Sequence, residues 1–455
     1  MQFLKKVATH KVPQFFRSGF TMVETLVALA VLGMFFAAIA LILHQILTQV
    51  GESRVRTTAL ALGQSKMEIV RNLPYDGVGT SGGIPPGPLA QTETVRINNL
   101  DLTITTSVVF IDDPYDGVSP ADTINTDYKR VRVEITWGGV YPSRKPATLV
   151  TNIAPRGIET IVGGGTLRIL VLNSLGDPIG GAPVQIDNTA VTPEIHLSTL
   201  TNNDGLVVLP GSPACIECYK ISVTKSGYSQ DRTFGTDEVT NPVLGHATVI
   251  EGDTTPITLA IDMVASIKIN SYGSRESGYP PVANVLFKLQ GSKIIGYDAD
   301  DNPVYKYVYA TNTGGGTVTV PSLEWDNYIL DLSDSFHNLA GANPILPAAL
   351  APGTNLTVSI VAVPKTNTSL LITVKNAAAQ LLASASASLT NAGLSYDVTK
   401  TTGATGSADF GQAYFGGLNP NIYDLKINLP GYVEATASLE LIKNHQEVFT
   451  LNYAE

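Results

Sequence analysis

The sequence is poor in cysteine and in charge. Only two of its 455 residues are cysteines, and charged side chains make up 15% of the chain. Two cysteines are too few for a disulfide framework, although a pair as close as Cys215 and Cys218 suits one local disulfide outside the cytoplasm. The net charge of −10 comes from scattered acids, which argues against nucleic acid as a partner.

The sequence also lacks the motifs that carry common enzyme chemistry. Its six histidines are scattered, and it contains no HExxH and no GxSxG segment. No glycine-rich phosphate loop stands between a strand and a helix. We therefore predict a protein that is not an enzyme and that needs no cofactor and no metal.

Proline is absent between Pro13 and Pro74. Residues 20–43 read FTMVETLVALAVLGMFFAAIALIL and contain one ionisable residue, Glu24. A helix of this segment is about 36 Å long, enough to cross a bilayer core of about 30 Å. Beyond it an amphipathic pattern continues, so we predict a helix over 20–73 whose part 20–43 is transmembrane.

The charges around the apolar segment predict its orientation. The leader 1–19 carries four basic residues and no acid, and the residues after the span are less basic (Lys5, Lys6, Lys11, Arg17). The leader is therefore expected in the cytoplasm and the bulk of the chain outside it. An ordinary signal peptide is one alternative, but its apolar core is usually about 7–15 residues. An uncleaved membrane anchor is the other.

The segment SGFTMVETLVAL resembles the cleavage and methylation motif of type IV prepilins and type II secretion pseudopilins. The resemblance implies that prepilin peptidase cuts after Gly19 and that Phe20 becomes the N-methylated terminus. Glu24 then occupies the fifth mature position. A carboxylate in an apolar span costs up to about 2.5–3.5 kcal/mol and persists where a partner pairs with it. In the family that partner is the terminal amine of a neighbouring pilin subunit; the alternative is a hydrated Glu24 near the interface.

One departure from the family concerns this helix. Many major pilins have a proline about midway along it, whereas here Gly33 is the only weak point. Local melting of the helix during assembly is therefore not implied for this chain.

Residues 74–157 are predicted to form a small β head. Alternating apolar residues mark strands in TVRINN, DLTITTSVVF, YKRVRVEITW and PATLVTNIA. A long helix covered by such a sheet resembles the head of pilins and pseudopilins, over residues 20–156. The cysteine-bounded loop common in pilin heads is missing, which makes minor pilins or pseudopilins the better match. PYDGV occurs at 74–78 and 114–118, where turns are favoured over calcium binding.

Three stretches of the remaining chain can be aligned with one another, each a series of strands with a tyrosine on a late strand. Their period of about 100 residues fits a sandwich fold. The order of elements resembles carboxypeptidase regulatory-like domains of the transthyretin-like type. The predicted fold class is thus an α+β head followed by all-β structure with three tandem Ig-like or transthyretin-like sandwiches. Their predicted bounds are 158–263, 264–364 and 365–455.

The second of these stretches departs from the pattern. It carries the insertion GSKIIGYDADDNPVYKYVYA and lacks the Gly-Tyr ending of the other two. Its Asp298, Asp300 and Asp301 lack the spacing of a calcium loop and are read as a hydrated hairpin tip. Tyr219, Tyr328 and Tyr423 suggest either a stripe that binds sugar or, as we expect, core side chains.

The cysteine pair lies in PACIECY ahead of a strand, where a thioredoxin-like site would need a helix. Two thiolates cannot complete a zinc site alone, so a disulfide that tightens a turn is the expectation.

These patterns predict a minor type IV pilin-like subunit in the cytoplasmic membrane and, after assembly, in a surface filament. Its predicted partners are prepilin peptidase, other pilin subunits, the membrane and a surface or polymer ligand. One alternative is a pseudopilin of a type II secretion or DNA-uptake machine. The other is an anchored surface protein that forms no filament.

Overall fold

The computed structural model describes residues 22–111, 127–139, 142–143, 145–155, 163–332 and 335–454. These residues fall into two compact units. The first combines the N-terminal helix with Ala90–Thr106 and Val131–Thr151. The second comprises Tyr75–Leu89, Ser107–Arg130 and Asn152–Glu455.

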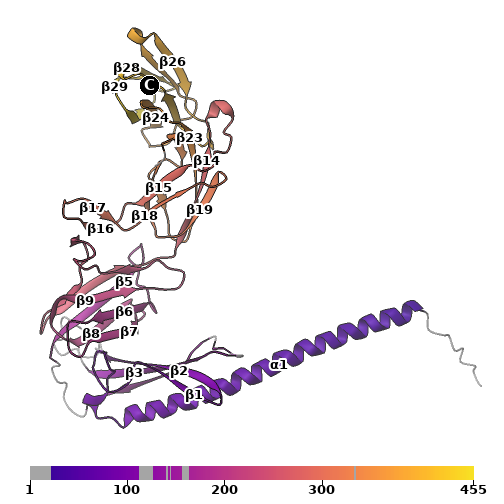
Figure 1. The fold of residues 1–455 in the computed structure, drawn as a ribbon, viewed down its shortest axis with the longest axis vertical. Helices are drawn as coiled ribbons and strands as arrows, with labels where there is room; N and C mark the ends of the chain where they lie inside the picture. Colours follow the sequence, from indigo (N-terminus) through magenta and orange to yellow (C-terminus); the bar gives the residue numbers. More distant parts are fainter. Residues whose placement is uncertain are drawn as a thin grey trace, which may run out of the picture. The chain divides into compact units, whose positions relative to one another are not determined.

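A single helix, α1 (Met22–Arg71), forms the N-terminal part of the first unit and runs unbroken for 50 residues (Figure 1). The absence of proline permits this length, because proline removes a backbone hydrogen bond and clashes with the preceding turn. The basic Arg71 lies in the last turn, where it complements the negative end of the helix dipole. The helix ends two residues before the predicted position 73, and the short 3-10 helix η1 (Tyr75–Gly77) follows.

The two halves of α1 differ in exposure. Apolar side chains of the first half, such as Leu26 and Phe35, are 64% and 61% exposed. By length and composition this helix can cross a membrane. The second half buries Ala59, Met67 and Val70.

The second half of α1 packs directly against a sheet. A Cβ atom on Gly63 would lie only 2.5 Å from Leu149 Cδ1 and 3.3 Å from Ile135 Cδ1, so the glycine lets the Leu149 side chain lie directly against the helix. Lys66 forms an ion pair of 2.6 Å with Glu93.

The sheet has four strands in the order β1-β2-β3-β4, and all four were predicted from alternation. On β3, Val131, Val133 and Ile135 are fully buried while the residues between them are partly exposed. The bounds are β1 Thr92–Ile97, β2 Leu100–Ile111, β3 Tyr128–Trp137 and β4 Ala147–Ile153.

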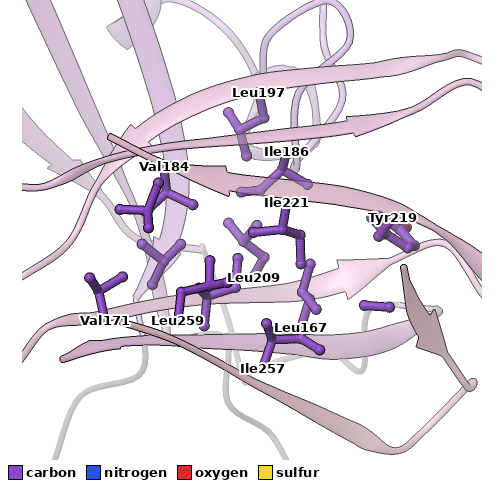
Figure 2. Packing of buried hydrophobic residues seen from close by; sticks show 14 of the residues in the cluster. Leu167, Val171, Val184, Ile186, Leu197, Leu209, Tyr219, Ile221, Ile257 and Leu259 are labelled. Atoms are coloured by element: carbon purple, nitrogen blue, oxygen red, sulfur yellow. The ribbon is translucent and has the colours of Figure 1, made fainter. Parts of the chain in front are cut away.

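The rest of the chain is β structure in three successive regions, each with its own buried core. The first β-region, residues 165–260, contains two facing sheets. Figure 2 shows Val184, Ile186 and Ile221 of one sheet packed against Leu167, Leu209 and Leu259 of the other. Its strands are β5 Gly165–Leu172, β6 Pro183–Asn188, β7 Ile195–Leu200, β8 Leu206–Ser212, β9 Cys215–Val223, β10 Asp231–Arg232, β11 Asn241–Pro242, β12 Ala247–Val249 and β13 Thr254–Ala260.

The second β-region, residues 265–364, has a sheet β19-β14-β23-β21 and a sheet β18-β15-β20-β22. The third, residues 369–451, has the sheets β27-β24-β30 and β26-β25-β28-β29. The strands of the second region are β14 Ala265–Tyr272, β15 Leu286–Gly291, β16 Ile294–Tyr297, β17 Pro303–Tyr305, β18 Val308–Asn312, β19 Thr317–Leu323, β20 Asp326–Leu332, β21 His337–Asn343, β22 Ala348–Leu350 and β23 Asn355–Pro364. Those of the third are β24 Ser369–Asn376, β25 Ser386–Asn391, β26 Tyr396–Thr401, β27 Gln412–Gly416, β28 Asn421–Asn428, β29 Ala435–Leu441 and β30 Asn444–Leu451.

The first and last strands of each region pair in parallel. β5 pairs with β13, β14 with β23 and β24 with β30, whereas the other strand pairs within these regions are antiparallel. The chain therefore closes each region by bringing its end back beside its beginning. This pairing gives hydrogen-bond partners to the backbone polar groups on the facing edges of the two strands, which a core cannot leave unsatisfied.

A buried threonine recurs in all three regions. The hydroxyl of Thr402 accepts a hydrogen bond from the Ala385 N–H (2.9 Å) and donates one to the Leu382 carbonyl (2.6 Å). Thr201 makes the same two bonds to Ala182 and Ile179. Thr313 makes them, more loosely, to Val285 and Val282.

The insertion of the second region is a hairpin of β16 and β17 (Figure 1). Its strand β16 pairs with β11 of the first region, so the two regions share a three-stranded sheet. The aspartates at its tip form the expected turn, in which Asp298 accepts hydrogen bonds from the N–H groups of Asp300 and Asn302.

Candidate functional site

The predicted cleavage residues Gly19 and Phe20 lie outside the described residues. Glu24 lies in the first turn of α1, three residues into the described chain, and its side chain is not described. The structure thus leaves the assignments of these three residues as predictions. For Glu24 it supplies the setting, which is the start of a continuous, exposed apolar helix.

The cysteine pair lies at the start of β9, with a separation of 6.0 Å between the Cα atoms and with the sulfur atoms joined. Between them Glu217 adopts a φ of 51°, and its N–H donates to the Thr248 hydroxyl at 2.9 Å. The segment is therefore the irregular start of β9, where the pairing with β12 shifts register between Cys215 and Tyr219, and not the turn ahead of a strand that the sequence predicts. The disulfide of the mature protein stays a proposal.

The three repeated tyrosines are core side chains, each at most 1% exposed. Each hydroxyl donates to a backbone carbonyl slightly upstream: Tyr219 to Pro213, Tyr328 to Glu324 and Tyr423 to Asn419. Burial raises the pKa of Tyr219 to about 12. These contacts favour the core reading, because rings with so little exposed surface cannot stack on a sugar.

The first PYDGV segment forms a turn whose carbonyl oxygens hold a lysine. Lys129 donates from Nζ to the carbonyls of Tyr75 and Val78, both at 2.8 Å, and Nζ lies 4.6 Å from the centre of the Tyr75 ring. Burial lowers the pKa of Lys129 to about 8, partly offset by Asp76. Sequence reasoning missed this buried lysine, because alternation along a strand does not reveal which distant segment packs against the strand. The second PYDGV copy lies outside the described residues.

A cavity of about 540 Å³ opens in the first β-region between the start of β9 and the segment from β10 to β12, which includes β11. Its lining is polar and includes Glu217, Asp237 and His246 together with Thr236, Thr240 and Asn241. No sequence pattern indicates it, since its residues meet only through the loop conformation. Among the described residues there is no group of three or more His, Cys, Asp or Glu side chains that could hold a metal.

Comparison with known families matches residues 16–40 to the prokaryotic N-terminal methylation motif. The chain carries a prepilin-type motif. The match covers the start of α1 and the residues before it, including the three predicted positions Gly19, Phe20 and Glu24. No curated protein matches the chain.

Solved structures similar to this chain are remote. The Bacillus anthracis TIE protein is 16% identical over 80% of this chain and 73% of its own, with a TM-score of 0.18. GBS52, the minor pilin of Streptococcus agalactiae, is 15% identical over 44% and 96%, with a TM-score of 0.22. BcpA, the major pilin subunit of Bacillus cereus, is 11% identical over 64% and 100%, with a TM-score of 0.17. At these scores the chains do not superpose as wholes, and no function is transferred from them.

The prepilin motif therefore carries the functional argument. It ties the N-terminal helix to processing, methylation and the membrane, while the β-regions follow it as a separate and larger part of the chain.

Proposed function

We propose that the chain is a minor type IV pilin-like subunit that prepilin peptidase processes between Gly19 and Phe20. The observation that carries the proposal is the prepilin motif at residues 16–40, set at the start of a helix of 50 residues with an exposed apolar half. In the membrane that half spans the bilayer; in a filament it packs against neighbouring subunits. Phe20 becomes the methylated terminus, and Glu24 pairs with the terminal amine of a neighbour.

The β-regions form three sandwich domains that the helix carries outside the membrane. Their separate cores and the closure of each by parallel pairing of its first and last strands support this division. Helices in a filament core pack about 10 Å apart. Three appended domains need more lateral room than that spacing leaves, which favours a sparse or terminal subunit over a shaft subunit. The domains then serve adhesion or surface display.

Two other functions remain alternatives. A pseudopilin of a secretion or DNA-uptake machine would share the processing but would not reach the surface. An anchored surface protein would stay in the membrane without a filament.

Mass spectrometry of the mature N-terminus tests the processing step. We expect a first residue of methylated Phe20. Retention of Met1, or a terminus near Ala40 as a signal peptidase would leave, contradicts the proposal.

Shearing of surface filaments tests assembly. The wild-type chain and a Glu68→Ala control are expected in the sheared fraction, because Glu68 is exposed near the end of α1 and pairs only loosely with Arg71. Glu24→Ala is expected to remain in the membrane. A wild-type chain that is processed but never sheared off would instead favour the pseudopilin.

A further inference from the structure

The cavity in the first β-region contains a hydrogen-bonding group that the described residues leave unused. His246 Nε2 is buried and has no hydrogen-bond partner among them. An unused buried polar atom costs about 1–3 kcal/mol, so native proteins rarely keep one without a reason. His246 also lines the cavity, so a molecule bound in the cavity can supply the missing hydrogen-bond partner.

The other ring nitrogen fixes which proton the imidazole carries. The Thr233 hydroxyl lies 3.0 Å from His246 Nδ1 and already accepts a hydrogen bond from the Ile221 N–H at 3.0 Å. Among the described residues the one other acceptor for the Thr233 hydroxyl is the Ile221 carbonyl, at 3.5 Å, which is long for a hydroxyl donor. The Thr233 hydroxyl thus donates to Nδ1. The proton of the neutral ring then lies on Nε2, which presents an unused donor.

An acceptor lies beside this donor. The position where a Cβ atom on Gly235 would stand is 3.0 Å from His246 Nε2, and Asp237 Oδ1 would overlap it. Asp237 is exposed, and no hydrogen bond or ion pair holds its side chain among the described residues. It can turn away from Nε2 and leave a donor and an acceptor on either side of a space that exists because residue 235 is glycine.

The loop that carries these groups is held in shape by its backbone. The Phe234 N–H donates to the Leu244 carbonyl at 2.9 Å, and the His246 N–H donates to the Phe234 carbonyl at 3.2 Å. Further along, the Val243 N–H donates to Ile295 of the inserted hairpin at 2.9 Å. A preformed site loses less conformational freedom on binding than a floppy one.

The charges of the lining select the ligand. Glu217 and Asp237 are carboxylates, and no lysine or arginine lines the cavity, so an anion is repelled. Burial and the nearby Lys220 lower the pKa of His246, which favours the neutral ring. An ammonium ion offers no acceptor to the Nε2–H donor. A hydroxyl group can accept from Nε2 and donate to Asp237, while the amide of Asn241 and the hydroxyls of Thr236 and Thr240 suit further hydroxyls.

We propose that this cavity binds a neutral saccharide unit, one hydroxyl of which bridges His246 Nε2 and Asp237 Oδ1. Its volume lies within the range of about 300–1,000 Å³ typical of small-molecule sites. The proposal deepens the surface role proposed above and rests on it for the location of the site outside the membrane. It assigns the ligand to the cavity of the first β-region and not to the rings of the buried tyrosines.

The test is isothermal titration calorimetry, in which the detergent-solubilised full chain is titrated with galactose, lactose and N-acetylglucosamine. At least one of them is expected to bind with a Kd on the order of 1 mM. Glucuronate, an anion, is the charged probe and is expected to bind less tightly, because Glu217 and Asp237 repel it. Lack of binding by every neutral probe at about fifty times that concentration, or tighter binding of glucuronate, overturns the proposal.

Two variants locate the site. Gly235→Ala places a methyl group between the donor and the acceptor, meeting only side-chain ends, and is expected to weaken binding by about tenfold or more. Gly315→Ala is the control, because a Cβ there meets nothing within 4 Å. Asp237→Ala is expected to weaken binding likewise, against Asp300→Ala at the exposed hairpin tip. Unchanged affinity in both site variants overturns the assignment.

Filament shearing and sugar titration separate the two proposals. A chain that assembles but binds none of the neutral probes contradicts only the saccharide site. A chain that binds a neutral sugar, with affinity weakened by Gly235→Ala and Asp237→Ala, but that is never processed contradicts only the pilin-like function.

Discussion

The guanidinium group of Arg275 binds the carboxylate of Asp409, with 3.0 Å between Nε and Oδ2. Arg275 belongs to the second β-region and Asp409 to the third. Asp409 is 5% exposed and also accepts a hydrogen bond from the Tyr279 hydroxyl, and Arg275 donates further to the backbone carbonyls of Thr401 and Gln412. The buried Gln412 side chain exchanges two hydrogen bonds with the backbone of Ala342. The two regions are therefore joined by specific polar contacts.

A double-mutant cycle of Arg275→Ala and Asp409→Ala measures this junction. We expect a coupling energy of about 1–3 kcal/mol in the free energy of unfolding, because the ion pair is largely desolvated. The control cycle uses Lys426 and Glu434, an exposed pair at 2.7 Å, for which about 0–1 kcal/mol is expected. Equal coupling energies in the two cycles would contradict the claim that the Arg275–Asp409 ion pair stabilises the junction of the two regions.

Acid should weaken the same junction. The hydrogen bond from Lys400 lowers the pKa of Glu276 from 4.5 to about 2. A carboxyl whose pKa is depressed by folding stabilises the native state above its unfolded pKa, and this contribution is lost as the pH falls from about 4.5 towards 2. Glu276 is largely exposed, so less than about 1 kcal/mol is at stake.

The measurement is denaturant unfolding at pH 6 and at pH 3 for the wild type and for Glu276→Gln. The wild type should lose more stability between these two pH values than the variant, whose amide does not titrate. A difference of the opposite sign would show that Lys400 does not favour the ionised carboxyl.

The repeated buried threonines predict a matched set of stability losses. Thr402→Val removes a hydroxyl that serves one N–H and one carbonyl, and should lower the free energy of unfolding by about 2–3 kcal/mol. Thr201→Val should cost a similar amount, and Thr402→Ser should retain most of the stability. The exposed Thr436→Val is the control, expected within about 0.5 kcal/mol of wild type. Thermal or urea unfolding measures these losses. A Thr402→Val chain as stable as the control would show that the Thr402 hydroxyl does not stabilise the fold.

The disulfide prediction is tested by alkylation. The denatured, unreduced chain should take up no iodoacetamide, and after reduction Cys215 and Cys218 should both be labelled. Because the ring closed is short, reduction should cost no more than about 2 kcal/mol. Labelling of both cysteines before reduction would show that they are free thiols.

The strands could be predicted from the sequence because the alternation of apolar and polar residues is a local property. In YKRVRVEITW the side chains alternate between core and solvent, and the strand β3 is where the pattern places it. The turn at Tyr75–Gly77 was likewise predicted from proline, aspartate and glycine. The buried positions of Tyr219, Tyr328 and Tyr423 followed from their place on late apolar strands.

The candidate sites could be predicted from the sequence only where all their residues lie in one continuous segment. The prepilin motif is contiguous, so residues 16–40 identify it without any tertiary structure. Glu217 comes from β9, whereas Asp237 and His246 come from the segment between β10 and β12, and nothing in their spacing indicates that they line one cavity. Lys129 shows the same limit, since its partners Tyr75 and Val78 are more than fifty residues away.

By itself the sequence determined the N-terminal apolar helix, the motif at its start and the β character of all that follows, because these depend on neighbours a few residues apart. Only the tertiary structure decided that β5, β14 and β24 pair in parallel with the last strands of their regions. It also decided that the inserted hairpin joins the first region through β11 and that a cavity forms beside His246. Such arrangements depend on which distant surfaces can bury one another and satisfy their hydrogen bonds, and no local pattern records that choice.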